Sequence, residues 1–265
     1  FCENVGFEEN YVTYAKYKEY IRKYKINNLV ETENIIEKQR MIKDEEEISN
    51  IQEACEITDN CFSYILSYIK PGMTEKQIAD EIEQYYKQRT DGLSFDTIVA
   101  SGENTSKPHA VPTDRKIQEK DIITIDMGCK VNGYCSDMTR TFFVGEVPEN
   151  IKPVYDLVLK NQLQTTEEYK DGANTRLLTK MVENDFKLNG YDLVHALGHG
   201  VGLEIHEAPY VNYKSDTQLR ENMVVTNEPG IYLPGKFGVR IEDTIAITKF
   251  GCISLTKSEK NYIVI

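Results

Sequence analysis

The chain has 265 residues, of which 40% are hydrophobic and 28% charged, and this composition fits one large globular domain or one domain with a small appendage. Its formal net charge of -12 argues against nucleic acid and anionic membranes as partners, because both would repel the protein at long range. No apolar run approaches the ~20 residues that a membrane span needs, whereas small peptides remain allowed as ligands.

The six cysteines are scattered without CxxC spacing, at Cys2, Cys55, Cys61, Cys129, Cys135 and Cys252. In so long a chain this scatter argues against a disulfide framework or a cysteine zinc site. We interpret them as reduced thiols and expect a cytoplasmic protein. The sequence begins at Phe1 and not at Met, so we keep open that an upstream domain or targeting segment precedes it.

The first forty residues differ in character from the rest of the chain. Five tyrosines recur there at helical spacing among lysines, at Tyr11, Tyr14, Tyr17, Tyr20 and Tyr24. This spacing predicts one amphipathic helix. After Arg40 the pattern becomes regular, and we therefore expect a boundary between residues 1–40 and residues 41–265.

Two helices are expected at the start of the larger part. Asp44 and Glu47 have the spacing of a capping box and precede a long apolar stripe, which predicts a long helix that ends at a Pro-Gly pair. Thr74 and Gln77 repeat the capping signature and predict a second, shorter helix. Strand-like residues follow from about 94–100.

The second half of the chain runs through the same plan. A helical pattern from about 150–169 is followed by an Asp-Gly turn, a helix over 175–188 that Gly190 stops, and strand-like segments. Helix, helix and hairpin therefore occur twice. This repeat predicts an α+β fold with two pseudo-symmetric halves around a shared central antiparallel sheet.

Two aspartates flank an expected hairpin. An Asn-Gly pair at 132–133 lies between two strand-like runs, which is a strong signal for a tight turn. In the register that this turn sets, Asp126 lies opposite Thr139 and Asp137 lies opposite Gly128, so both aspartates face the same side of the sheet. Diagonal neighbours are ~7–8 Å apart at the backbone, which lets two carboxylates hold a pair of ions. A single strand aspartate is more often solvent-exposed, but two on one face favour a site.

Histidine is rare in the chain, at His109, His195, His199 and His206. Three of the four fall in one twelve-residue window, with glycines at alternate positions between them. Glycine at this spacing is costly in a helix and marks close backbone approach in a strand or loop, which argues against a helical zinc site. A lone histidine usually has a hydrogen-bonded structural role, but this window favours a cluster of ligands and catalytic groups.

Two glutamates, Glu228 and Glu242, lie on strand-like runs further along. In the second run apolar residues alternate with Arg240 and Glu242, so these two share a polar face. If the glutamates converge with Asp126 and Asp137, four negative charges crowd together, and protonation or metal must relieve the repulsion. Two divalent cations would balance them.

Taken together, these motifs resemble the Xaa-Pro aminopeptidase and prolidase group of metallopeptidases, which have the pita-bread fold. The resemblance rests on the spacing of Asp126 and Asp137 and on the ordered stretches GHGVGLEIHEAP, NEPGIY and GVRIEDT. It covers the chain from about Leu29 to the end. It implies that residues 41–265 are the catalytic domain and that residues 1–40 are the remaining tail of an N-terminal domain plus a linker.

The resemblance also assigns roles. It implies five metal ligands, namely Asp126, Asp137, His199, Glu228 and Glu242. It implies that His109, His206 and Glu228 are catalytic, the histidines as groups that polarise the substrate and Glu228 as a proton shuttle, and that His195 and Arg240 line the site. We expect the Arg240 guanidinium to brace Asp126 or Asp137.

The implied reaction is hydrolysis of the peptide bond that precedes proline, by an Xaa-Pro aminopeptidase or Xaa-Pro dipeptidase that uses a metal-bridging hydroxide. Carboxylates and one imidazole, with no thiolate, suit two manganese ions, with cobalt or zinc as alternatives. The expected substrates are small peptides with proline at the second position, and a homodimer is compatible with the resemblance.

Two other functions stay open. Methionine aminopeptidase shares the fold and the five ligands, but Arg240 before Glu242 favours the proline-specific branch. A non-catalytic pita-bread module that binds peptides is the other alternative, although such modules have usually lost ligands and all five are present here.

Overall fold

The structure is a computed structural model that describes residues 4–26 and 28–265. Contacts within the chain divide it into two units, residues 1–40 and residues 41–265. The division falls at the residue where the sequence pattern changes. That the first unit is the tail of a larger N-terminal domain stays a prediction.

The described residues of the first unit, 4–26 and 28–40, form two strands and two helices. Strands β1 (Asn4–Glu8) and β2 (Asn28–Thr32) pair in parallel. Helix α1 (Tyr14–Tyr24) lies between them in sequence, where the tyrosine spacing predicts a helix, and the Thr13 side chain caps its first turn. Helix α2 (Ile35–Arg40) ends the unit.

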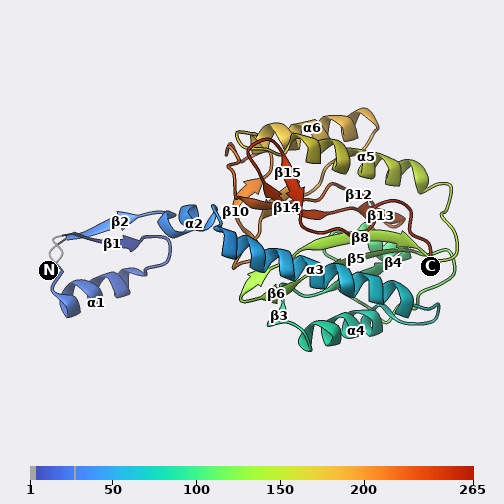
Figure 1. Ribbon diagram of the computed structural model, residues 1–265, viewed down its shortest axis with the longest axis horizontal. Helices are drawn as coiled ribbons and strands as arrows, with labels where there is room; N and C mark the ends of the chain where they lie inside the picture. Colours follow the sequence, from blue (N-terminus) through green and yellow to red (C-terminus); the bar gives the residue numbers. More distant parts are fainter. Residues whose placement is uncertain (1–3, 27) are drawn as a thin grey trace. The chain divides into compact units, whose positions relative to one another are not determined.

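The second unit has four longer helices, which are α3 (Glu45–Tyr68), α4 (Glu75–Lys87), α5 (Lys152–Glu168) and α6 (Thr175–Leu188). Both predicted capping boxes are present, with Asp44 and Glu47 at the start of α3 and Thr74 and Gln77 at the start of α4. Within this unit, Figure 1 shows α5 and α6 above the strands, α4 below them and α3 crossing in between.

The described strands of this unit pair antiparallel, in four sheets rather than one continuous sheet. The first half contributes β3 (Gly92–Leu93), β4 (Ile98–Ser101), β5 (Ile122–Met127), β6 (Cys129–Val131), β7 (Tyr134–Cys135) and β8 (Met138–Phe143), with the 3-10 helix η1 (Gly102–Ser106) after β4. The second half contributes β9 (Gly198–Gly200), β10 (Glu207–Val211), β11 (Val224–Asn227), β12 (Gly230–Leu233), β13 (Phe237–Arg240), β14 (Asp243–Ile247) and β15 (Cys252–Ser254). The strand orders are β4-β5-β8, β3-β6-β7, β12-β13 and β10-β9-β11-β14-β15.

The two halves repeat the same turn between their helices. Gly72 has a φ of 94° and donates its backbone N–H to the Ile117 carbonyl at 2.8 Å. Gly172 has a φ of 83° and donates to the Leu219 carbonyl at 2.8 Å. The left-handed backbone favours glycine at both positions. The same turn at the same place in each half confirms the predicted repeat.

Each half also has its own apolar core. One cluster is built around Phe62, Ile65 and Phe142, and the other around Tyr155, Val182 and Phe186. A smaller cluster draws on both halves, with Ile51, Cys55, Cys135, Val201, Val224, Ala246 and Leu255. Close packing of this kind makes the junction between the halves a rigid base for side chains that point into a cavity.

The five described cysteines, Cys55, Cys61, Cys129, Cys135 and Cys252, are free thiols, and Cys2 lies outside the described residues. Burial raises the pKa of the Cys61 thiol to about 12, so this thiol stays protonated and unreactive at neutral pH. In residues 4–26 and 28–265 no helix is long and apolar enough to cross a membrane.

Candidate active site

A cavity of about 550 Å³ lies in the second unit. Its polar wall includes His109, Asp126, Asp137, His195, His199, His206, Glu228, Arg240 and Glu242. Its apolar wall includes Phe95, Ile98, Val111, Pro112, Ile205 and Tyr210. The structure therefore brings all nine predicted site residues to one cavity, while their individual roles remain proposals.

The two aspartates come from the predicted hairpin. Asp126 is in β5 and pairs with Thr139 of β8, as the sequence predicts. The turn at 132–133 joins β6 and β7 in the expected register. Asp137 directly precedes β8. Both carboxylates line the same cavity because the hairpin keeps them on one face.

The two glutamates are not inside strands, and this part of the prediction is wrong. Glu228 lies between β11 and β12, and Glu242 lies between β13 and β14. In both cases the chain passes from one sheet to another at the glutamate. The run from 239–247 is thus two strands. Alternation still sends Arg240 and Glu242 to the cavity, because Val239 and Ile241 are buried in the core on the opposite side.

His199 is the middle residue of β9, and the positions before and after it in the strand have room only for glycine. A Cβ atom on Gly198 would lie 2.1 Å from the Thr226 carbonyl oxygen, and one on Gly200 would lie 2.4 Å from the Ala208 carbonyl oxygen. Neither approach is sterically allowed for a larger residue. The glycines therefore mark close backbone approach in a strand, as predicted, and His199 is buried between them.

Three groups form the centre of the site. One ligand atom each from Asp137, His199 and Glu242 lie within 4.8 Å of one another. The Nδ1 atom of His199 is 3.1 Å from the Gly200 carbonyl oxygen, so this nitrogen carries the proton. The lone pair of Nε2 then faces Asp137 Oδ2 and Glu228 Oε1, each at 3.4 Å. An imidazole fixed in this tautomer is suited to bind a metal.

Burial and mutual repulsion raise the pKa values of two of the carboxylates. Burial raises the pKa of Asp137 well above its ordinary value, and the charges of Glu242 and Asp126 raise it further. Burial followed by the charge of Glu228 does the same to the pKa of Glu242. Burial lowers the pKa of His199, which keeps its imidazole neutral. These shifts favour the protonated acids in the ion-free site, and a divalent cation would favour the deprotonated carboxylates.

The donor set fits divalent cations. Oδ1 of Asp126 is buried with no hydrogen-bond partner, although a buried carboxylate oxygen normally has one. This oxygen, three further carboxylates and one neutral imidazole form a hard, oxygen-rich set without a thiolate. A cation would satisfy the orphaned oxygen and relieve the repulsion between the acids.

Arg240 braces this acidic wall at two points. Its Nη2 atom donates to Asp126 Oδ2 at 2.6 Å. Its Nε atom donates to the Thr139 hydroxyl at 3.0 Å, and that hydroxyl donates to Glu242 Oε2 at 2.6 Å. One guanidinium thus orients a carboxylate from each half of the fold. The partner that the sequence analysis expected, Asp126 or Asp137, is Asp126.

Sequence reasoning missed three residues that hold the site in place. Thr139 joins Arg240 to Glu242. The Thr226 hydroxyl donates to Glu228 Oε1 at 3.1 Å. The Tyr232 hydroxyl lies 2.8 Å from Arg240 Nη1 and 3.0 Å from His195 Nε2. Hydroxyl residues are common in strands, so no pattern singled these out, although Tyr232 is part of the NEPGIY stretch.

The remaining histidines surround the centre. The ring centroid of His206 is 4.3 Å from that of His199, and its exposed side chain faces the cavity. Partial burial of the ring against the cavity wall, followed by the charge of His199, lowers the pKa of His206. Burial also lowers the pKa of His195, whose Nδ1 bonds to the Ala196 carbonyl at 2.7 Å. His109 is exposed at the cavity wall.

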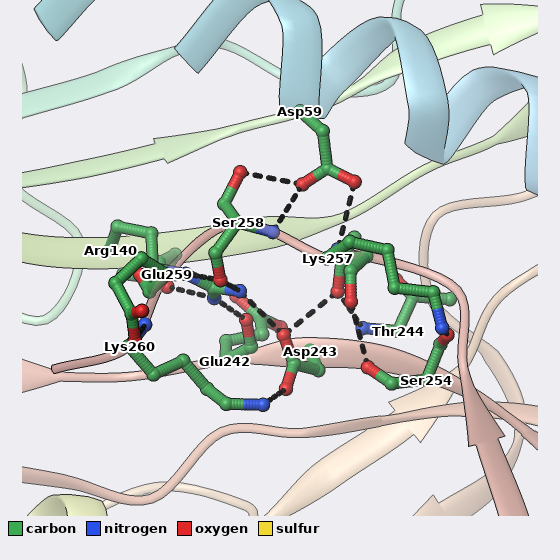
Figure 2. A network of polar contacts seen from close by, with 12 residues as sticks. Asp59, Arg140, Glu242, Asp243, Thr244, Ser254, Lys257, Ser258, Glu259 and Lys260 are labelled. Carbon is green, nitrogen blue, oxygen red and sulfur yellow. Dashed lines mark hydrogen bonds and ion pairs between the residues drawn. The ribbon is translucent and has the colours of Figure 1, made fainter. Parts of the chain in front are cut away.

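A buried ion pair between Arg140 and Asp243 lies next to Glu242 (Figure 2). Arg140 Nη2 is 2.7 Å from Asp243 Oδ1, and both side chains are almost fully buried. Arg140 Nη1 also donates to the backbone carbonyl of Glu242. Lys260, from the C-terminal segment, pairs with Asp243 as well. Burial acts to raise the pKa of Asp243, but Arg140 and Lys260 lower it below its ordinary value. The backbone of Glu242 is thereby fixed next to the cavity.

Two similar halves gather four carboxylates and a neutral imidazole in one cavity, and this donor set suits divalent cations. A family model described as metallopeptidase family M24 matches residues 49–249. The chain therefore belongs to metallopeptidase family M24.

Known proteins agree with this assignment. The chain is 41% identical to an Xaa-Pro dipeptidase of Pyrococcus furiosus over 209 residues, which are 78% of this chain and 60% of that protein. The structure of the X-Pro aminopeptidase from Thermotoga maritima matches with a TM-score of 0.94 at 35% identity, covering 99% of this chain and 76% of that one. An Xaa-Pro dipeptidase from Bacillus anthracis matches with a TM-score of 0.94 at 41% identity, covering 99% and 75%. The pita-bread resemblance is confirmed.

Proposed function

We propose that the chain hydrolyses the peptide bond that precedes proline in small peptides, as an Xaa-Pro dipeptidase or Xaa-Pro aminopeptidase. The observation that carries the proposal is the position of Arg240, which pairs with Asp126 and reaches Glu242 through Thr139. An arginine before the last acidic residue is the feature that favours the proline-specific branch. The names of the similar proteins support the same substrate class.

Asp126, Asp137, His199, Glu228 and Glu242 would hold two divalent cations. Carboxylates and one imidazole suit manganese, and cobalt or zinc are alternatives. When bound, such ions polarise the scissile carbonyl and lower the pKa of a water molecule towards neutrality. The protein contributes a cavity in which the ligands are already oriented by Arg240, Thr139 and Thr226.

Glu228 is the group that we assign to proton transfer. In the ion-free site burial raises the pKa of Glu228 above its ordinary value, and the charges of His195 and Arg240 oppose that rise. The Thr226 hydroxyl holds Oε1 at 3.1 Å. Glu228 would accept the proton of the attacking water and deliver it to the departing imino nitrogen of proline.

His206 and His109 are the groups that we assign to the substrate carbonyl. Both lie at the cavity wall with exposed side chains, so each can donate a hydrogen bond to the oxygen on which negative charge develops. The apolar wall, which includes Phe95, Val111 and Tyr210, suits the pyrrolidine ring. A ring without an amide N–H loses no hydrogen bond when it is buried there.

One set of assays tests the function. The protein is incubated with Mn²⁺ and with an Xaa-Pro dipeptide, an Xaa-Pro-Yaa tripeptide, the same peptides with alanine for proline, and Met-Ala-Ser. We expect cleavage of the proline peptides only, and the ratio of dipeptide to tripeptide cleavage assigns the type. Cleavage of Met-Ala-Ser and of no proline peptide would make the chain a methionine aminopeptidase. Binding of peptides without any cleavage would make it a binding module.

A further inference from the structure

The carboxylate of Glu75, the first residue of α4, is completely buried and outside the metal cluster. It accepts hydrogen bonds from five groups, which are the Ser101 backbone N–H at 2.7 Å, the Ser101 hydroxyl at 2.6 Å, the Asn104 amide at 3.1 Å, the Thr113 backbone N–H at 2.9 Å and the Thr113 hydroxyl at 2.6 Å. Hydrogen bonds to a charged acceptor are the strong ones. We call this carboxylate, together with the donors that converge on it, the Glu75 clamp.

The donors come from the two ends of one segment. Oε1 receives both groups of Ser101, and Oε2 receives both groups of Thr113. The Asn104 amide contacts both oxygens. Glu75 therefore closes the segment 102–112, which we call the His109 loop, in the way that a disulfide closes a covalent loop.

The His109 loop also rests on the wall of the active site. The Thr105 hydroxyl accepts from the Gly238 backbone N–H at 2.9 Å. The Pro108 carbonyl accepts from Arg240 Nη1 at 2.9 Å. His109 follows directly, and its exposed side chain reaches the cavity. Because the side chain is exposed, the position of its imidazole depends on the backbone of the loop.

The pseudo-symmetric half shows that the turn itself does not need this acid. Glu75 donates its backbone N–H to the Arg115 carbonyl at 3.1 Å. Thr175, which starts α6, donates in the same way to the Thr217 carbonyl at 3.0 Å. A threonine serves at the equivalent place, so a capped helix and a closed turn do not by themselves require a buried carboxylate. Burial of a carboxylate is costly unless it is hydrogen-bonded, and the donors of Glu75 come from the two ends of 102–112.

We propose that Glu75 is a positioning residue that sets the place of His109 over the scissile carbonyl by clamping both ends of the His109 loop. The role of His109 rests on the proposed peptidase function, but the clamp does not. Glu75→Gln tests it, because glutamine keeps the shape and replaces one acceptor oxygen with an amide N–H₂ that faces donors at either Ser101 or Thr113.

Amide hydrogen exchange tests the clamp without any substrate. In Glu75→Gln, peptides that cover 102–112 are expected to exchange faster than in the wild type, while peptides that cover β5 are unchanged. Glu103→Gln is the matched control, because it makes the same charge change on an exposed side chain of the same loop. Unchanged exchange of the loop in Glu75→Gln would overturn the clamp.

Kinetics test the connection to His109. Glu75→Gln is expected to lower kcat on an Xaa-Pro peptide by ~10-fold or more at unchanged metal content. His109→Ala is expected to lower kcat by ~10²-fold. If Glu75 acts through His109, the kcat of the Glu75→Gln/His109→Ala double variant should lie within about 3-fold of the kcat of His109→Ala alone. The proposal would be overturned if the two reductions in kcat multiply in the double variant, or if Glu75→Gln loses metal.

A milder variant covers the case in which Glu75→Gln does not fold. Thr113→Val removes one hydroxyl donor and keeps the backbone N–H. It is expected to show faster exchange in the loop and a lower kcat, again without an additional effect in the His109→Ala background. A wild-type protein that cleaves no proline peptide would refute the proposed function, and the exchange result would still decide the clamp.

Discussion

The guanidinium of Arg240 lies 2.6 Å from the carboxylate of Asp126, and the two side chains come from different halves of the fold. The same guanidinium contacts the Thr139 hydroxyl, the Tyr232 hydroxyl and the Pro108 carbonyl. These contacts use three different nitrogens in one plane. A planar fork with donors in fixed directions can satisfy all of them together, and a single ammonium group cannot.

The first prediction is therefore that Arg240→Lys lowers kcat on an Xaa-Pro peptide by ~10-fold or more, although the positive charge is kept. Steady-state kinetics at saturating Mn²⁺ measure the effect. Arg220→Lys, on an exposed arginine, is the matched control and should leave turnover unchanged. Wild-type turnover in Arg240→Lys would remove this residue from the site.

The second prediction separates ligand from catalyst. His199 is in the buried cluster with Asp137 and Glu242, whereas His206 is exposed at the cavity wall. His199→Ala should lose bound metal, and its activity should fall as a consequence. His206→Ala should keep its metal and lose ~10²-fold or more in kcat. Metal analysis after gel filtration decides between them, and loss of metal from His206→Ala would mean that this histidine is a ligand.

The third prediction concerns pH and metal. Burial and neighbouring charges raise the pKa of Asp137 and Glu242, so in the ion-free fold these carboxyls keep protons that the unfolded chain has lost. Their contribution stabilises the ion-free fold at low pH and is lost as the pH rises through the raised pKa values. Metal needs the deprotonated carboxylates. The increase in Tm on adding Mn²⁺ should therefore be larger at about pH 8 than at about pH 6.

Calorimetry or thermal fluorescence at the two pH values measures this difference. His199→Ala is the control, because it lacks one ligand and should show little increase in Tm at either pH. An equal increase at both pH values in the wild type would contradict proton displacement by the metal.

The fourth prediction concerns stability rather than activity. Asp243→Asn leaves Arg140 buried without its charged partner, which should lower the free energy of unfolding by about 3 kcal/mol. Asp185→Asn removes a partly exposed pair with Lys160 and should cost less than about 1 kcal/mol. Urea unfolding in the presence of EDTA compares the two without a contribution from metal. Similar losses in both variants would show that the buried pair contributes no more to the free energy of unfolding than the partly exposed pair does.

Local patterns in the sequence predicted local structure well. The capping boxes at Asp44 and Thr74 are present because a cap depends on residues three positions apart. The register that places Asp126 opposite Thr139 is present because a two-residue turn sets the pairing of its strands. The break at Glu242 was missed, because apolar alternation continues across it and does not mark where a chain leaves one sheet for another.

The sequence by itself determined which residue types are available for chemistry and which local elements carry them. The histidine window, the glycines around His199 and the ordered acidic residues, together with the family resemblance that they carry, were enough to predict the contents of one site. Only the tertiary structure decided which atoms meet. Arg240 reaches Asp126 across 114 positions and Glu75 reaches Thr113 across 38. Such contacts depend on how segments far apart in the sequence pack, and packing is a property of the whole fold that no short sequence window contains.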